Sequence, residues 1–93
     1  YVFLLAETLA AAGVAQGLDR ELSARLARAT VSGAGELLRQ SAESASQLRQ
    51  NVTSPGGTTA AALSVLMREG DGLPDLMAEA IADATKRGRE LAG

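Results

Sequence analysis

Apolar residues recur at spacings of three and four along most of this chain, which is the period of a helix with one buried face. One such repeat runs from Arg20 to about Gln40 and is carried by Leu22, Leu26, Ala29, Gly33 and Leu37. Another follows Pro74, which suits the first position of a helix, and is carried by Leu73, Leu76, Met77, Ala80, Ile81, Ala84 and Leu91. No segment alternates as a strand does, so the sequence predicts an all-α fold of about five helices.

The opening stretch, Tyr1 to about Gln16, is apolar around most of the helix circumference and carries Glu7 as its only charge. A helix of this kind is buried on several sides. A chain this small can hardly cover all of those sides with its own helices, so we expect burial against a second subunit. Gly33 and Gly35 disfavour the helix that contains them, which predicts close approach by another helix.

Short polar signals mark where the helices begin and end. Gly17 is expected to close the first helix, and Asp19 to cap the second. Ser44 and Gln47 match a capping box that opens a short third helix. Gly70 is expected to end the fourth helix, which begins near Thr58.

The segment Val52–Thr59 carries the chemistry of the chain. Pro55-Gly56 is the pair that a type II turn requires, and Gly57 lets the backbone come close to another group. The amides of Thr58 and Thr59 would be among the first unpaired N–H groups of the next helix, an arrangement that attracts small anions. Hydroxyl groups that could assist belong to Thr53, Ser54, Thr58 and Thr59. The segment lacks lysine, so a carboxylate fits it better than a polyphosphate, and a plain helix-capping turn remains the alternative.

Composition narrows the chemistry further. Apolar residues make up 46% of the 93 residues and aromatic residues only 2%, which predicts thin, closely spaced helices and a need for partner chains. Without cysteine or histidine, the chain excludes disulfides, thiolate nucleophiles, imidazole catalysis and the usual zinc sites, and we expect no metal. The net charge is −2, and acidic and basic residues are interspersed along the chain, so the sequence shows no basic patch that would bind nucleic acid or an anionic membrane. We expect a cytoplasmic protein.

The segment Val52–Thr59, preceded by Gln47-Leu48-Arg49, resembles the signature of pyrroline-5-carboxylate reductases. Tyr1–Leu5 resembles the first helix of that family's dimerisation domain, and Ala84–Leu91 resembles its end. The resemblance implies that residues 1–93 form a C-terminal helical dimerisation and substrate-binding domain, interlocked with its twin as in 6-phosphogluconate dehydrogenase C-terminal-like folds. It also implies an N-terminal dinucleotide-binding domain, absent from this chain, which would bind NADP or NAD.

The same resemblance implies an oxidoreductase that reduces 1-pyrroline-5-carboxylate to proline, working as a homodimer or higher homo-oligomer. Its substrate-binding residues would be Val52, Ser54, Gly56, Gly57, Thr58 and Thr59. The amides of Gly57 and Thr58 would hold the substrate carboxylate beside Ser54, and the Thr59 hydroxyl, the one catalytic candidate, would face the ring nitrogen. Glu43 lies just before the short third helix and could approach the site, although a solvated turn carboxylate is the commoner case.

Two alternatives stay open. The chain could be a non-catalytic helical homodimerisation module whose Val52–Thr59 loop is only a helix cap. It could also be a domain of a related dehydrogenase that acts on another imine or on a hydroxy acid.

Overall fold

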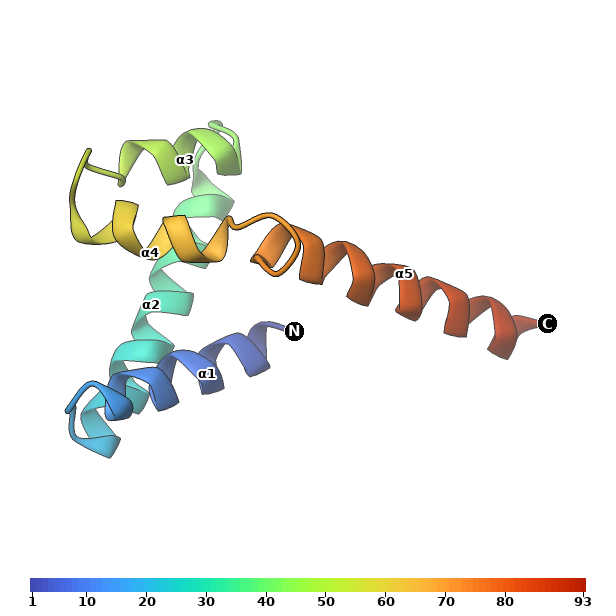
Figure 1. Cartoon of the computed structure of the whole chain (residues 1–93), viewed down its shortest axis with the longest axis horizontal. Helices are drawn as coiled ribbons and strands as arrows, with labels where there is room; N and C mark the ends of the chain where they lie inside the picture. The colour runs from blue at the N-terminus through green and yellow to red at the C-terminus, as the bar shows by residue number, and fades with distance from the viewer. The chain divides into compact units, whose positions relative to one another are not determined.

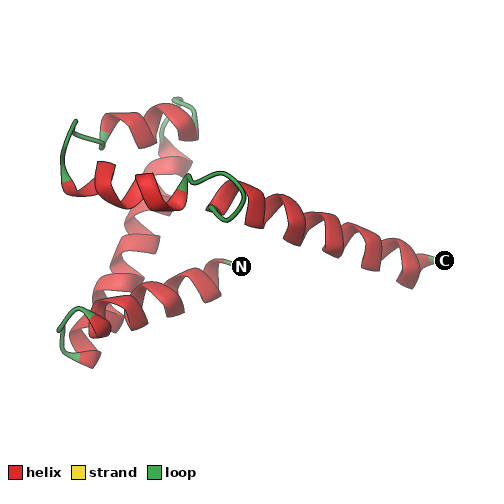
Figure 2. Cartoon of the chain, viewed as in Figure 1, coloured by secondary structure: helices red, strands yellow, loops and turns green.

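Five α-helices joined by turns make up the chain, and the computed structural model describes all 93 residues (Figure 1). The helices are α1 (Val2–Ala15), α2 (Arg20–Gln40), α3 (Ala45–Asn51), α4 (Thr58–Leu66) and α5 (Leu73–Ala92). Colouring by secondary structure shows helices and loops and no strand (Figure 2). The predicted all-α fold with about five helices is confirmed. The chain divides into two units, Tyr1–Leu48 and Arg49–Gly93.

The turn between α1 and α2 has the expected chemistry at both helix ends. Gly17 has φ of 104°, and the Leu18 N–H donates to the Gly13 carbonyl at 3.0 Å, so α1 ends in a Schellman motif. Asp19 then caps α2 by accepting a hydrogen bond from the Leu22 N–H at 3.1 Å. Both predictions for this turn are confirmed.

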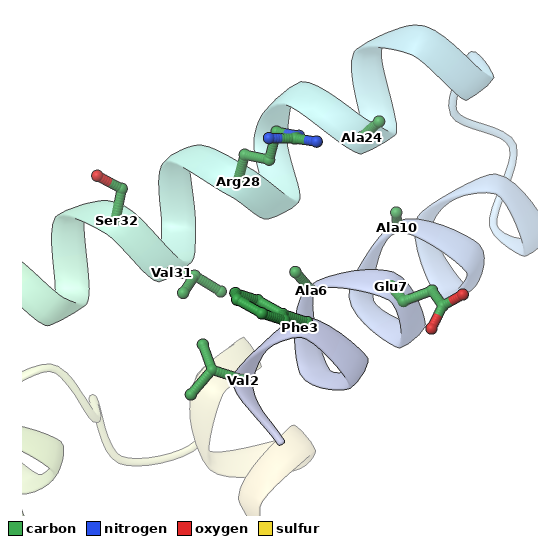
Figure 3. Close-up of a pocket in the computed structure, with 9 residues that line it drawn as sticks. All are labelled: Val2, Phe3, Ala6, Glu7, Ala10, Ala24, Arg28, Val31 and Ser32. Atoms are coloured by element: carbon green, nitrogen blue, oxygen red, sulfur yellow. The ribbon is translucent and has the colours of Figure 1, made fainter.

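The contact between α1 and α2 is tightest near this turn. The Ser23 hydroxyl donates to the Ala10 carbonyl at 2.7 Å, and a Cβ placed on Gly13 would overlap the Ser23 Oγ. Ser23 (2% exposed) and Ala27 (5% exposed) are the buried residues here. From this crossing the two helices diverge toward Val2 (Figure 3). The first unit therefore has one close helix crossing and little core of its own.

We expect Gly13→Ala to destabilise the protein by about 1–3 kcal/mol, because the added methyl forces Ser23 out of its place and breaks the bond to Ala10. Urea denaturation followed by circular dichroism measures the free energy of unfolding. The control is Gly13→Ala combined with Ser23→Ala, which removes the overlapping oxygen and should recover part of the loss. A double variant less stable than Gly13→Ala alone would contradict this account of the crossing.

The two glycines of α2 that predicted a close helix contact find none within the chain. Nothing lies within 4 Å of a Cβ built on Gly33 or Gly35. Close approach by another helix therefore remains a prediction.

The end of α4 differs from the sequence-based prediction. The helix ends at Leu66 rather than at Gly70. Arg68 leaves the helix and forms two hydrogen bonds with the Asp71 carboxylate, at 3.0 and 3.1 Å, while its carbonyl accepts from the Gly72 N–H at 3.0 Å. Gly70, with φ of 88°, is the residue that permits this bend. The prediction was wrong because a closed turn, not a single glycine, terminates the helix.

The last helix, α5, begins at Leu73, so Pro74 is its second residue and not its first. Its apolar residues form a line along one side, as predicted, and this line is here called the α5 stripe. The members of the α5 stripe are Leu73, Leu76, Met77, Ala80, Ile81, Ala84 and Leu91. All of them are exposed in the single chain. No helix of the chain has the length and apolar character needed to span a membrane.

Charged side chains form exposed pairs on the helix surfaces. The pairs Glu36–Arg39, Arg68–Asp71 and Arg87–Glu90 each join residues three positions apart. Hydrogen bonds from Arg39, and secondarily from Gln40, lower the pKa of Glu36. The pairing is therefore present above the ordinary pKa of a glutamate and is lost as the pH falls through the lowered value. Exposed pairs of this kind add little to stability.

Candidate functional site

The segment between α3 and α4 folds into the turn that its sequence predicts. Gly56 has φ of 72°, and the Gly57 N–H donates to the Ser54 carbonyl at 3.0 Å, which closes the four-residue turn begun at Ser54. Positive φ at the third position is the mark of a type II turn, with Pro55 fixing the second. A Cβ on Gly57 would lie only 3.2 Å from the Ser54 carbonyl oxygen, so the turn is tight at this point.

The turn leads directly into the first residue of α4. Gly57 is the N-cap in extended conformation and has no side chain with which to cap the helix. The first helical bond runs from the Ala61 N–H to the Gly57 carbonyl at 3.1 Å, so the amides of Thr58 and Thr59 precede the hydrogen-bonded ladder. Both threonines are exposed. The positive end of the helix dipole and these N–H groups thus lie together at the start of α4.

The hydroxyl groups of the segment do not all behave as the sequence suggested. Thr53 donates its hydroxyl to the Arg49 carbonyl at 2.6 Å, and its N–H donates to the Gln50 carbonyl at 3.1 Å. It therefore closes the end of α3, and its hydroxyl proton is not offered to an anion. Val52, 63% exposed, lies in the same turn and presents its side chain to solvent.

The remaining candidates lie close together along the chain. Ser54 and Gly57 are joined by the turn hydrogen bond, and Gly56 shapes it. Thr58 and Thr59 follow as the first two residues of α4. Glu43 lies in the connection between α2 and α3, where its N–H donates to the Ser41 hydroxyl at 3.0 Å.

One support of this loop was missed by sequence reasoning. The Arg49 Nη1 lies 3.5 Å from the Met67 Sδ, so the end of α3 contacts the residue that follows α4. The contact joins the two helices that flank the turn. Sequence gives little signal for it, since a methionine and an arginine eighteen positions apart carry no spacing rule.

The groups at this site can attract an anionic ligand and hold it in one orientation. Backbone amides at a helix start bind a carboxylate, and nearby hydroxyls can donate one further hydrogen bond. No group of three or more acidic side chains is placed to hold a metal ion. No dinucleotide fingerprint of the Gly-x-Gly-x-x-Gly type occurs in the chain, so no residue here is assigned to a nucleotide cofactor.

The family model for pyrroline-5-carboxylate reductase dimerisation matches residues 1–91. The chain belongs to this family. The chain is 45% identical to pyrroline-5-carboxylate reductase of Glycine max over 91 residues. The aligned region covers 98% of the chain and 32% of the Glycine max protein. The chain is 43% identical to the Synechocystis enzyme of the same name, over 98% of the chain and 33% of that protein.

A solved structure supports the family's fold for this chain. A crystal structure of Plasmodium falciparum pyrroline carboxylate reductase with NADP bound matches the whole chain with a TM-score of 0.91 at 34% identity, and the match covers 35% of that protein. The chain thus spans about a third of the length of the relatives it matches. The family resemblance drawn from Val52–Thr59 is confirmed.

Proposed function

We propose that this chain is the C-terminal dimerisation and substrate-binding domain of an enzyme that reduces 1-pyrroline-5-carboxylate to proline with NADPH or NADH. An N-terminal domain outside the chain would bind the dinucleotide. Membership of the pyrroline-5-carboxylate reductase dimerisation family supports the proposal, as does the name of every relative described above. We place the enzyme in the cytoplasm, as the absence of cysteine permits.

The observation that carries the substrate site is the start of α4, which no side chain caps. Its first amides have no acceptor in the helix, its N-cap residue Gly57 has no side chain to cover them, and the turn at Gly56 holds them in place. A carboxylate placed there would receive hydrogen bonds from Gly57 and Thr58 or from Thr58 and Thr59. Because the Gly57 N–H already bonds to the Ser54 carbonyl, we favour the amides of Thr58 and Thr59.

The reaction requires a hydride at the imine carbon and a proton at the ring nitrogen. The dinucleotide supplies the hydride when it is bound. The residues of this chain would fix the carboxylate, and through it the ring, so that the imine carbon is presented in one orientation. Thr59 would direct its hydroxyl toward the ring nitrogen, where the positive charge of the protonated imine is lost as the amine forms.

The dimer is supported by the exposed apolar side chains of each unit. In Tyr1–Leu48, Phe3 on α1 is 91% exposed, and in Arg49–Gly93, Leu76 on α5 is 54% exposed. Apolar patches of this kind are typical of interaction surfaces, and obligate homodimers cover them with each other.

Replacing Thr59 by valine in the full-length enzyme tests the proposal. The variant keeps the size of the side chain and the backbone amide but loses the hydroxyl. We expect kcat for proline formation to fall roughly fivefold, with little change in KM, because a neutral hydrogen bond is worth about 1 kcal/mol. Steady-state kinetics monitored by dinucleotide oxidation provide the measurement.

Thr59→Ser is the matched control and should keep most of the activity. If valine and serine variants both retain wild-type kcat, Thr59 has no part in the reaction. If the full-length protein shows no reduction of 1-pyrroline-5-carboxylate with either dinucleotide, the proposed activity itself fails, and the non-catalytic dimerisation module becomes the better interpretation.

A further inference from the structure

We propose that Thr53 is a positioning residue for the reaction, because its hydroxyl fastens the segment Val52–Thr59 to α3 and so fixes the amides that receive the substrate carboxylate. The inference rests on the proposed function and concerns a residue to which that function assigns no contact with substrate. Thr53 acts through the start of α4 and not on the reacting atoms.

Thr53 is held on α3 by two hydrogen bonds. Its hydroxyl donates to the Arg49 carbonyl at 2.6 Å, and its N–H donates to the Gln50 carbonyl at 3.1 Å. The last four carbonyls of a helix accept no bond from within the helix, so both acceptors are of the kind that a following residue can satisfy. Two bonds from one residue to successive carbonyls fix its place and also the direction in which the chain leaves α3.

Thr53 is an inner point of a segment that is otherwise mostly exposed. Within Val52–Thr59, Thr53 and Gly57 are half-buried, and all the other residues are exposed. The exposed tip, Ser54–Gly56, lies between these two residues along the chain. A loop with so little burial depends on the fastening of its ends for a fixed position, and Thr53 is the end that bonds to α3.

Few steps separate Thr53 from the amides proposed to bind substrate. Ser54 follows Thr53 directly, and its carbonyl accepts a hydrogen bond from the Gly57 N–H at 3.0 Å. Gly57 is the N-cap of α4, and Thr58 and Thr59 are the first two residues of that helix. Because the turn is closed by its own hydrogen bond, a displacement of Thr53 moves the turn and the start of α4 together.

Arg49 also contacts the residue at the other end of α4. Its Nη1 lies 3.5 Å from the Sδ of Met67, which is the C-cap of α4. A thioether sulfur is a weak acceptor, so this contact holds α4 less firmly than the short hydroxyl bond at Thr53. The Thr53 hydroxyl bond is therefore the stronger of these two ties between α3 and α4.

Loss of the hydroxyl should affect orientation more than binding. The amides at the start of α4 remain after the Thr53 side chain is changed, so a carboxylate can still bind to them. Groups that bind substrate keep their geometry only when the residues behind them are fixed, and a misplacement of about 1 Å can cost about 100-fold in rate. The presentation of the imine carbon is then the step that suffers.

Replacing Thr53 by valine in the full-length enzyme tests the inference. The variant keeps the branched shape and the bond from the N–H to Gln50, so we expect only part of that 100-fold loss: kcat for proline formation falls roughly tenfold, and KM stays within about threefold. Thr53→Ser retains the hydroxyl and should restore most of kcat. The matched control is Thr30→Val in α2, which removes a hydroxyl bond of the same kind, from Thr30 to the Leu26 carbonyl at 2.7 Å, and should leave kcat unchanged.

Amide hydrogen exchange gives a second measurement that does not depend on activity. In mass spectrometry of peptides that cover Gly57–Leu66, we expect faster exchange in Thr53→Val than in the wild type, and wild-type exchange in Thr53→Ser and Thr30→Val.

Three results would overturn the inference in an active enzyme. They are wild-type kcat in Thr53→Val even if its thermal midpoint is lower, a loss in Thr53→Ser as large as that in Thr53→Val, and an equal loss in Thr30→Val. If the wild-type enzyme does not reduce 1-pyrroline-5-carboxylate, the proposed function fails by itself. The exchange measurement then decides the role of Thr53, and a rate that Thr53→Val leaves unchanged would overturn the inference as well.

Discussion

Replacing Thr58 by proline in the full-length enzyme is expected to lower kcat/KM for proline formation roughly 10- to 150-fold while leaving the fold intact. Proline lacks the N–H that we assign to the substrate carboxylate, and a hydrogen bond to a charged group is worth about 1.5–3 kcal/mol. Thr58 is the first residue of α4, where proline is well tolerated. The preceding residue, Gly57, already has the extended conformation (φ −88°, ψ −175°) that a following proline demands.

Thr58→Ala is the matched control for this prediction. It removes the side chain but keeps the N–H, and activity should stay within about threefold of the wild type because the amide makes the charged bond. Steady-state kinetics measure both variants, and circular dichroism checks that α4 persists. A proline variant as active as the alanine variant would show that the Thr58 amide does not bind the substrate. Equal losses in both variants would assign the effect to the side chain instead.

Local signals in the sequence predicted the parts of the fold that depend on few residues. Gly17, Asp19 and Ser44 mark helix ends through hydrogen bonds that span at most a few positions, and the structure contains each of them. The bend at Gly56 was equally predictable because the Pro-Gly pair restricts its own backbone.

The parts that sequence did not predict depend on several residues acting together. The end of α4 was misplaced because the Arg68–Asp71 pair and the Gly72 N–H close a turn that no single residue signals. The role of Thr53 was misread because a threonine hydroxyl serves a helix end or a ligand equally well, and only the position of the Arg49 carbonyl decides between them. Contacts with long sequence separation, such as Arg49 with Met67, follow no periodic rule.

The two kinds of site candidate also differ in how they arise. Amides at the start of α4 are presented by backbone geometry, so a turn motif suffices to predict their place. A groove between α1 and α2, lined by Phe3, Ala6 and Val31 among others, forms because the two helices are close at Gly13 and Ser23 and then diverge (Figure 3). The apolar sequence of α1 predicted that another surface covers this helix. The shape of the groove beside it could be described only from the structure.

Replacing Ile81 by aspartate is expected to raise the dimer dissociation constant by more than about 100-fold. Ile81 is 44% exposed in the single chain, so the substitution costs little while the chain is alone. In the dimer, the α5 stripe would be covered, and a buried carboxylate without a partner costs well over the roughly 3 kcal/mol to which a 100-fold change corresponds. The two-fold contact repeats the penalty in both copies.

Sedimentation velocity over a range of concentrations measures this effect, with Ala82→Asp as the matched control. The control adds the same charge to the same helix, one residue away and on the side opposite the stripe, and should leave the dimer unchanged. If the dissociated monomer unfolds, the midpoint temperature of thermal unfolding falls and depends on protein concentration. Thermal unfolding then reports the weakened dimer in place of sedimentation. An Ile81→Asp protein that dimerises as tightly as the Ala82→Asp protein would mean that the α5 stripe stays exposed to water in the dimer. The exposed apolar residues of α1 would then have to form the dimer contact without α5.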